Sequence, residues 1–209
     1  MSEFSDGVLF LKKHTDMARS ALQSLNKPYR LKEINQQWSA VFVEEANPKV
    51  DPLRGWMIEQ SSSFPILFFE HPEDHGWGYR VFYDGEETAS LFVSYELSYS
   101  MYIDVVQNRF PDVDPHIGIE QKKARAIREA VITSDAYRQR AAAQFRNRNV
   151  EQFSHFEFSD EVLRELEQVV TIDWYLDKDK QLQQVQEFKR LTNIREVSWM
   201  SYRYITRDE

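Results

Sequence analysis

Short, continuously apolar runs dominate the first hundred residues and predict buried strands. They occupy residues 7–12, 38–43 and 66–70 and are rich in branched and aromatic residues, which favour strands. Between the first two runs, apolar residues recur at three- and four-residue spacing, which predicts a helix over 16–25. A second short helix is expected over 53–60.

The clearest turn signal in the chain is Asp84-Gly85, which lies between two runs rich in β-forming residues. Asp-Gly pairs in this position favour the tight turns of hairpins. Residues 66–95 are therefore predicted to form a three-stranded antiparallel meander, and a proline-containing loop is expected earlier, at 47–52. The order of elements up to residue 95 is typical of a mixed or antiparallel sheet with helices on one face.

Helical spacing replaces the apolar runs after residue 95. Leu97, Met101 and Val105 lie four residues apart and predict a helix over 98–109. Further helices are expected over 119–132, 135–147, 160–170 and 178–192.

These patterns together predict an α+β fold with a mixed or antiparallel sheet in the N-terminal half and a mostly helical C-terminal half. A strand-rich portion is expected at 1–110, with a helical portion at 118–209 packed on it as one compact unit. The segment 110–118 is the best candidate for a boundary because it contains two prolines, two aspartates and a glycine.

Composition narrows the class of protein. The 209 residues are 42% apolar and 14% aromatic, enough to build a large core without disulfides or metals. No cysteine is present, which excludes disulfides and thiolate metal sites and favours a reducing compartment. The acidic N-terminus does not resemble a secretory signal, and no apolar run approaches the ~18 residues of a membrane span. A soluble cytoplasmic protein is therefore expected.

Charge is distributed unevenly along the chain. The net charge is −8, yet residues 121–150 carry eight Lys or Arg against two carboxylates. Within this stretch Lys122, Lys123, Arg125 and Arg128 are candidates for phosphate contacts in a nucleic-acid binder. The acidic pI and the absence of a nucleic-acid motif favour a solvated helical face instead. Such a face could also complement the acidic first half, within one molecule or across a dimer.

Two histidines, His71 and His75, flank a proline and two carboxylates and form the most concentrated set of metal-ligating residues. Imidazole and carboxylate groups both suit zinc and similar divalent ions, and His116 could complete the set in space. The alternative is a solvated loop, because Pro72 and Gly76 disfavour the helix on which paired histidines would converge.

Trp77 and Tyr79 are candidate binding residues. Trp77 lies between two glycines, which permit a close backbone approach and could shape the wall of a pocket. Packing on the core is the favoured interpretation, because aromatic residues at the start of a meander strand commonly face inward.

The C-terminal segment 197–205 is unusually aromatic, and Trp199 and Tyr202 are candidate contact residues. Aromatic residues are enriched in interface cores, so the segment could dock on a partner. Docking on the protein's own sheet is the favoured interpretation, because it is the commonest way to cover an apolar C-terminal segment. The spacing fits a strand or a helix, and the alternation of aromatic with polar residues favours a strand.

Standard catalytic and nucleotide-binding patterns are absent from the sequence. The chain lacks GxSxG, GxxxxGK(S/T), GxGxxG and HExxH motifs. The leading hypothesis is a non-enzymatic protein-interaction or regulatory module that needs no cofactor and binds a protein partner or a second copy of itself. The alternatives are a metal-assisted or acid–base enzyme that uses the 71–75 loop and a nucleic-acid binder that uses helices within 121–148.

Overall fold

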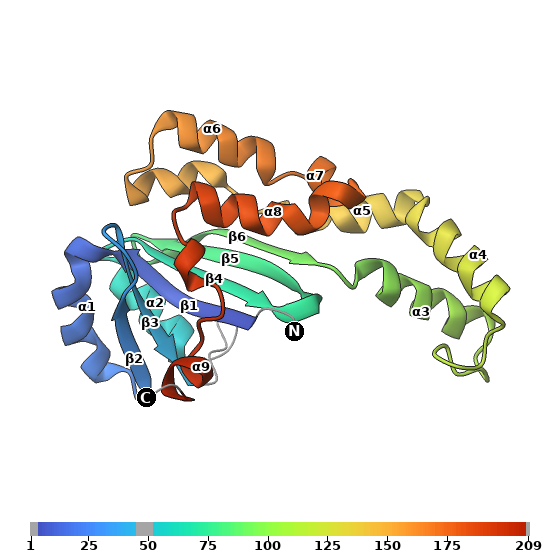
Figure 1. The fold of residues 1–209 in the computed structure, drawn as a ribbon, viewed down its shortest axis with the longest axis horizontal. Coiled ribbons are helices and arrows are strands. Elements are labelled where there is room, and N and C mark those ends of the chain that lie inside the picture. Colours follow the sequence, from blue (N-terminus) through green and yellow to red (C-terminus); the bar gives the residue numbers. More distant parts are fainter. Residues whose placement is uncertain (1–3, 45–51, 208–209) are drawn as a thin grey trace.

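The computed structural model describes residues 4–44 and 52–207, and its centre is a six-stranded sheet (Figure 1). The strands are β1 (Phe4–Leu11), β2 (Tyr29–Glu33), β3 (Trp38–Val43), β4 (Ile66–Pro72), β5 (Gly76–Tyr83) and β6 (Glu86–Ser94). They lie in the spatial order β2-β3-β1-β4-β5-β6, and each neighbouring pair is antiparallel. The predicted α+β fold is confirmed, with a sheet that is antiparallel rather than mixed.

The predicted meander is confirmed as β4, β5 and β6. Asp84 and Gly85 join the last two strands with φ angles of 52° and 80°. Positive φ at both central residues is what a tight hairpin turn requires. The loop expected at 47–52 lies outside the described residues, apart from Pro52, at which α2 (Pro52–Ser61) begins.

The sheet is apolar on both sides because successive strand residues point to opposite faces. On β1, Val8 and Phe10 belong to one core cluster, whereas Leu9 and Leu11 belong to another. The first cluster packs against α1 (Thr15–Ala21) and α2, and the second against helices from the second half of the chain. The expectation of helices on one face only was therefore wrong, because strands such as β3 are buried at every residue.

A layer of helices covers the second face of the sheet. It consists of η4 (Val150–Phe156), α6 (Asp160–Val169), α7 (Ile172–Leu176) and α8 (Lys178–Leu191). Ser159, Thr171 and Asp177 cap the N-termini of α6, α7 and α8, each by accepting a backbone hydrogen bond through its side chain. The helices predicted over 160–170 and 178–192 are confirmed as α6 and α8. The shorter η4 and α7 were missed because neither is long enough to display a helical period.

Two further helices extend away from the sheet (Figure 1). They are α3 (Leu97–Arg109) and α4 (Gln121–Ile132), and together with the loop between them they are called the arm. A separate small cluster that includes Tyr102, Val106 and Ile127 holds the two helices together. The segment 110–118 lies in the loop at the far end of this arm.

The chain after α5 (Asp135–Gln144) covers the outer edge of β6. An edge strand presents unpaired backbone groups that other chains could pair with. Here the Ser90 N–H donates to the Asn147 carbonyl at 2.7 Å, and the Asn149 amide donates to the Thr88 carbonyl at 2.7 Å. These contacts hold the end of α5 against the sheet and so position the base of the arm.

The C-terminal segment does not form the strand that its alternating aromatic residues favoured. It forms η5 (Arg195–Val197) and α9 (Tyr202–Arg207). Trp199 has a φ of 60°, its N–H donates to Ser5 Oγ at 2.9 Å, and the Met200 carbonyl accepts from the Asp6 N–H at 3.0 Å. Most of β1 is already paired with β3 and β4, so no continuous strand edge remains for this segment to join.

Replacing glycine with alanine should have opposite effects on stability at two positions. Gly76 has a φ of 145°, and a Cβ there would lie 2.1 Å from the Val93 carbonyl oxygen. We expect Gly76→Ala to lower the free energy of unfolding by at least about 1–3 kcal/mol, from the backbone conformation alone. Gly55 lies in α2, and no atom lies within 4 Å of the position that an added Cβ would take, so Gly55→Ala should raise stability by roughly 0.5–1 kcal/mol. Urea unfolding of both variants measures this, and equal stabilities would contradict it.

Candidate functional site

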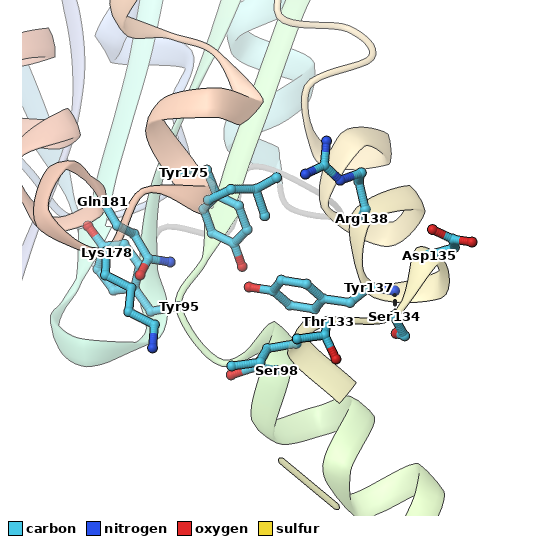
Figure 2. Close-up of a pocket in the computed structure, with 12 residues that line it drawn as sticks. Tyr95, Ser98, Thr133, Ser134, Asp135, Tyr137, Arg138, Tyr175, Lys178 and Gln181 are labelled. Carbon is cyan, nitrogen blue, oxygen red and sulfur yellow. Dashed lines mark hydrogen bonds between the residues drawn. The ribbon is translucent and has the colours of Figure 1, made fainter. Parts of the chain in front are cut away.

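A cleft of about 440 Å³ lies where the arm joins the body of the protein (Figure 2). It is bounded by the start of α3, the turn between α4 and α5, and the region where α7 meets α8. The lining residues are Tyr95, Ser98, Ile132, Thr133, Ser134, Asp135, Tyr137, Arg138, Tyr175, Leu176, Lys178 and Gln181. Its volume falls within the range typical of sites for small organic ligands.

Two helix caps direct tyrosines into this cleft. The Ser134 hydroxyl accepts a hydrogen bond from the Tyr137 N–H at 3.1 Å, and α5 begins one residue after this serine. Thr171 caps α7 in the same way, and this short helix carries Tyr175. In Figure 2 the hydroxyls of Tyr137 and Tyr175 point toward one another across the cleft. The two rings are positioned locally because each helix begins at a side chain that satisfies its free N–H groups.

The Tyr175 side chain is only 2% exposed and forms the floor of the cleft. Its hydroxyl donates to the Ser94 carbonyl at 2.9 Å. Burial raises the pKa of Tyr175 above its usual value, and the neighbouring Tyr137 hydroxyl raises it further. The phenol therefore stays protonated and neutral, so it serves as a hydrogen-bonding group and not as a base.

Two cationic side chains line the cleft, Arg138 from α5 and Lys178 from α8. Figure 2 shows them on different sides, with Tyr137 and Tyr175 between them. Among the described residues, neither cation forms an ion pair with a carboxylate. The cleft therefore holds two positive charges whose counter-charge is not supplied by the described part of the chain.

Two neighbouring cations on the same helices do form ion pairs with carboxylates. Arg140 pairs with Asp104 at 3.0 Å, and Lys180 pairs with Asp177 at 3.2 Å. Asp177 also accepts the Asp179 N–H as the N-cap of α8. These two ion pairs lie outside the cleft lining, so on each helix a paired cation lies two residues after the cation that lines the cleft.

The three histidines predicted to bind a metal occupy different surroundings. His71 is buried on β4, His75 pairs with Glu96 at 3.1 Å, and His116 Nδ1 lies 2.5 Å from the Tyr99 hydroxyl in the arm. The described residues contain no group of three or more His, Asp or Glu that could hold a metal ion. The metal site remains a prediction, which elemental analysis of the purified protein would test.

One of these histidines, His75, lines a cavity together with residues of the C-terminal segment. A second cavity, of about 310 Å³, is lined by Phe4, Pro72, His75, Ser201, Arg203 and Tyr204. Two of the regions singled out from the sequence, the 71–75 loop and the tail, therefore share a cavity.

Trp77 and Tyr79 are completely buried beneath the helical layer. Both rings contact Phe188 of α8, with ring centroids 5.0 Å and 5.2 Å away. The Tyr79 hydroxyl donates to the Arg148 carbonyl, and burial raises the pKa of this tyrosine. Neither side chain is available at the surface, which agrees with the core-packing interpretation.

The two aromatic residues predicted in the tail differ in exposure. Trp199 is 42% exposed and packs edge-on against Tyr204, with the ring centroids 6.2 Å apart. Tyr202 is half-buried, and the Arg30 guanidinium lies over its ring at 5.8 Å. The tail therefore docks on its own chain and leaves one indole partly open to solvent.

The four predicted basic residues Lys122, Lys123, Arg125 and Arg128 all lie exposed on α4 of the arm. Arg125 pairs with Glu129 of the same helix at 2.9 Å. The Lys123 ammonium lies 3.9 Å from the Phe110 ring centre, and the Arg128 guanidinium lies 4.7 Å from that of Tyr102. The structure thus brings these residues together on one helix.

The cleft was not found from the sequence. Tyr137 lies within the basic stretch 121–150, where the sequence pointed only to cations, and Tyr175 lies on a helix that was missed. The lining comes from separate segments of the chain, and none of them carries a recognisable motif. The one local signal that could have helped is Thr171 followed by Asp173, an N-cap residue type with an acidic residue in the first turn of the helix.

Comparisons with known proteins leave this site to be interpreted from its own chemistry. No protein-family model, no curated protein and no solved structure matches the chain. Across the described ranges 4–44 and 52–207, the helices are too short or too polar to cross a membrane.

Proposed function

We propose that the protein is a non-catalytic interaction module in which the arm binds an acidic protein surface. One observation carries the proposal: α4, which holds four Lys or Arg against one Glu, lies in the arm and projects away from the acidic strand-rich half (Figure 1). Residues 1–100 hold nine Lys or Arg against fifteen Asp or Glu, and the other four cations of the stretch 121–148 lie on or after α5, at the base of the arm. Surfaces of opposite charge steer protein association and favour matching partners.

The ion pairs of the arm support an intermolecular role for this charge. Arg125 pairs with Glu129 of its own helix, and Arg140 pairs with Asp104 of α3. Both partners belong to the arm or its base, and neither belongs to the acidic sheet portion. The cations Lys123 and Arg128 of α4 contact aromatic rings, which leaves their charge available to a partner.

Exposed apolar side chains accompany the basic helix. Ile117, in the loop at the tip of the arm, is 85% exposed. Tyr99 and Ile132 are 41% and 38% exposed. Apolar groups beside cations are a combination that protein interfaces use, because the apolar groups contribute affinity and the charges contribute orientation.

A second copy of the chain is the partner that we favour. Residues 150–191 of the helical layer hold ten Asp or Glu against five Lys or Arg. Asp160 and Glu161, at the start of α6, are exposed and form no ion pair among the described residues. The arm of one molecule could therefore find a complementary surface on another.

Sedimentation velocity at low and high salt tests this proposal. Wild-type protein should self-associate at about 20 mM NaCl and dissociate at about 500 mM, because salt screens exposed charges. The double variant Lys122→Glu/Lys123→Glu should weaken association by about tenfold or more at low salt, from lost attraction and new repulsion.

The matched control is Arg203→Glu/Arg207→Glu, which reverses two exposed cations on α9, outside both proposed surfaces, and should leave association unchanged. A wild-type protein that stays monomeric at high concentration and low salt would contradict the choice of partner. Salt-sensitive binding to duplex or single-stranded nucleic acid, lost in the Lys122→Glu/Lys123→Glu variant, would overturn the proposal in favour of a nucleic-acid binder.

A further inference from the structure

We infer that the cleft at the base of the arm binds a compact organic dianion, with one acidic group near Arg138 and the other near Lys178. This site is separate from the exposed face of α4 and does not depend on the function proposed for the arm. Its chemistry is that of a small dicarboxylate, or of a small molecule that carries a carboxylate and a phosphate ester at opposite ends.

The two cations define the ends of the ligand. Arg138 and Lys178 come from different helices and lie on different sides of the tyrosine pair (Figure 2). A guanidinium binds carboxylate or phosphate oxygens through two parallel N–H groups, and an ammonium acts as a point charge. A single small anion would neutralise one of them, whereas a molecule with separated acidic groups would neutralise both.

The middle of the cleft suits the body of such a ligand. The half-buried Tyr137 provides ring surface and a hydroxyl between the two charged ends, whereas Tyr175 is almost fully buried and its O–H is already donated to the Ser94 carbonyl. Ser98 and Gln181 add polar groups along the wall. A few convergent polar groups on a largely preformed cavity are typical of small-molecule sites.

The one carboxylate in the lining does not remove the preference of the cleft for an anionic ligand. Asp135 is the only carboxylate among the residues that line the cleft, and in Figure 2 it points away from the tyrosine pair. Lys178 lies between Asp177 and Asp179 in the sequence; Asp177 is engaged by Lys180 and by the Asp179 N–H, and neither carboxylate forms an ion pair with Lys178 in the described part of the chain. The positive charge at both ends is therefore offset little by the side chains around it.

Isothermal titration calorimetry of the purified protein tests the inference with a defined set of compounds. The dianions, each with two separated acidic groups, are succinate, glutarate, adipate and phosphoglycolate, and the matched single anions, each with one acidic group, are butyrate and inorganic phosphate. We expect at least one dianion to bind tenfold or more tightly than the single anions and to raise the Tm. Preference for a dicarboxylate or for the phosphate ester then distinguishes the two sources of the charge.

Four single variants connect binding to the cleft. Arg138→Gln and Lys178→Gln should each weaken the best dianion by about tenfold, since each removes one end of the site. Arg140→Gln and Arg190→Gln remove paired cations on the same helices, away from the cleft, and should leave binding unchanged. The inference is overturned if no dianion binds better than butyrate, or if the control variants lose as much affinity as the cleft variants. The cleft variants should leave self-association intact, so failure here is distinguishable from failure of the proposal for the arm.

Discussion

Replacing Phe188 with alanine is expected to lower the free energy of unfolding by about 3–5 kcal/mol, the usual cost of removing a buried aromatic ring. The side chain is completely buried, and its ring contacts those of Phe69, Trp77, Tyr79 and Phe153 at centroid distances of 5.0–5.9 Å. It is therefore the point at which α8 is packed onto the sheet. Loss of the ring would leave a cavity that four rigid aromatic neighbours cannot readily fill.

Urea unfolding measures this effect, with two variants as controls. Phe188→Leu keeps most of the apolar volume and should cost less than Phe188→Ala. Leu182→Ala lies on the same helix, but Leu182 is 66% exposed, so its stability should stay within about 0.5 kcal/mol of wild type. If Phe188→Ala and Leu182→Ala were equally stable, α8 would not be packed onto the sheet as described.

Asp6→Asn is expected to stabilise the protein at pH 8 and to change it little at pH 4. Burial raises the pKa of Asp6 from 3.8 to about 7, and Glu70, its partner on β4, contributes to this rise by like-charge repulsion. Asp6 Oδ1 is buried and has no hydrogen-bond partner among the described residues. Between pH 3.8 and pH 7 the folded state therefore holds a proton that the unfolded state has lost.

The direction in which stability changes with pH follows from the extra proton that the folded state holds on Asp6. The stability that the neutral carboxyl contributes is fully present below pH 3.8 and is lost as the pH rises through 7. A shift of about three units corresponds to about 4 kcal/mol as an upper bound. Urea unfolding from pH 4 to pH 8.5 should show the two proteins diverging as the pH rises. Glu86→Gln, which removes an exposed carboxylate from the same sheet, is the control for charge alone, and parallel curves for wild type and Asp6→Asn would contradict the prediction.

The regular elements could largely be predicted from local patterns. Apolar runs located β1, β3 and β4, and the Asp84-Gly85 pair located the β5–β6 hairpin. Helical periodicity located α3, α4, α6 and α8. These predictions succeeded because a buried strand and an amphipathic helix each impose their own spacing on the chain.

The tail shows where local patterns fail. Its alternation of aromatic and polar residues fits a strand, but a strand needs a free edge with which to pair. The described sheet offers β1 no such edge beyond its first residues, because β3 and β4 occupy both sides. Tertiary packing therefore decided between two local interpretations of the same spacing.

The candidate sites also differ in how far local sequence could locate them. Residue type alone identified the basic residues of α4, and the structure gathers them on one exposed helix. Residue type also suggested the three histidines, yet each has different neighbours in the folded chain. Proximity along a sequence brings side chains together only when the local backbone makes them converge, and Pro72 and Gly76 prevent that around His75.

The amino-acid sequence by itself determined the α+β class, the positions of most helices and strands, and the uneven distribution of charge. Only the tertiary structure decided that helices cover both faces of the sheet, that α3 and α4 project as an arm, and that Arg138 and Lys178 line one cleft. The physical reason is the separation along the sequence of the residues that define each feature. Periodicity and charge are properties of neighbouring residues, whereas a cleft arises only when segments distant in the sequence pack against one another.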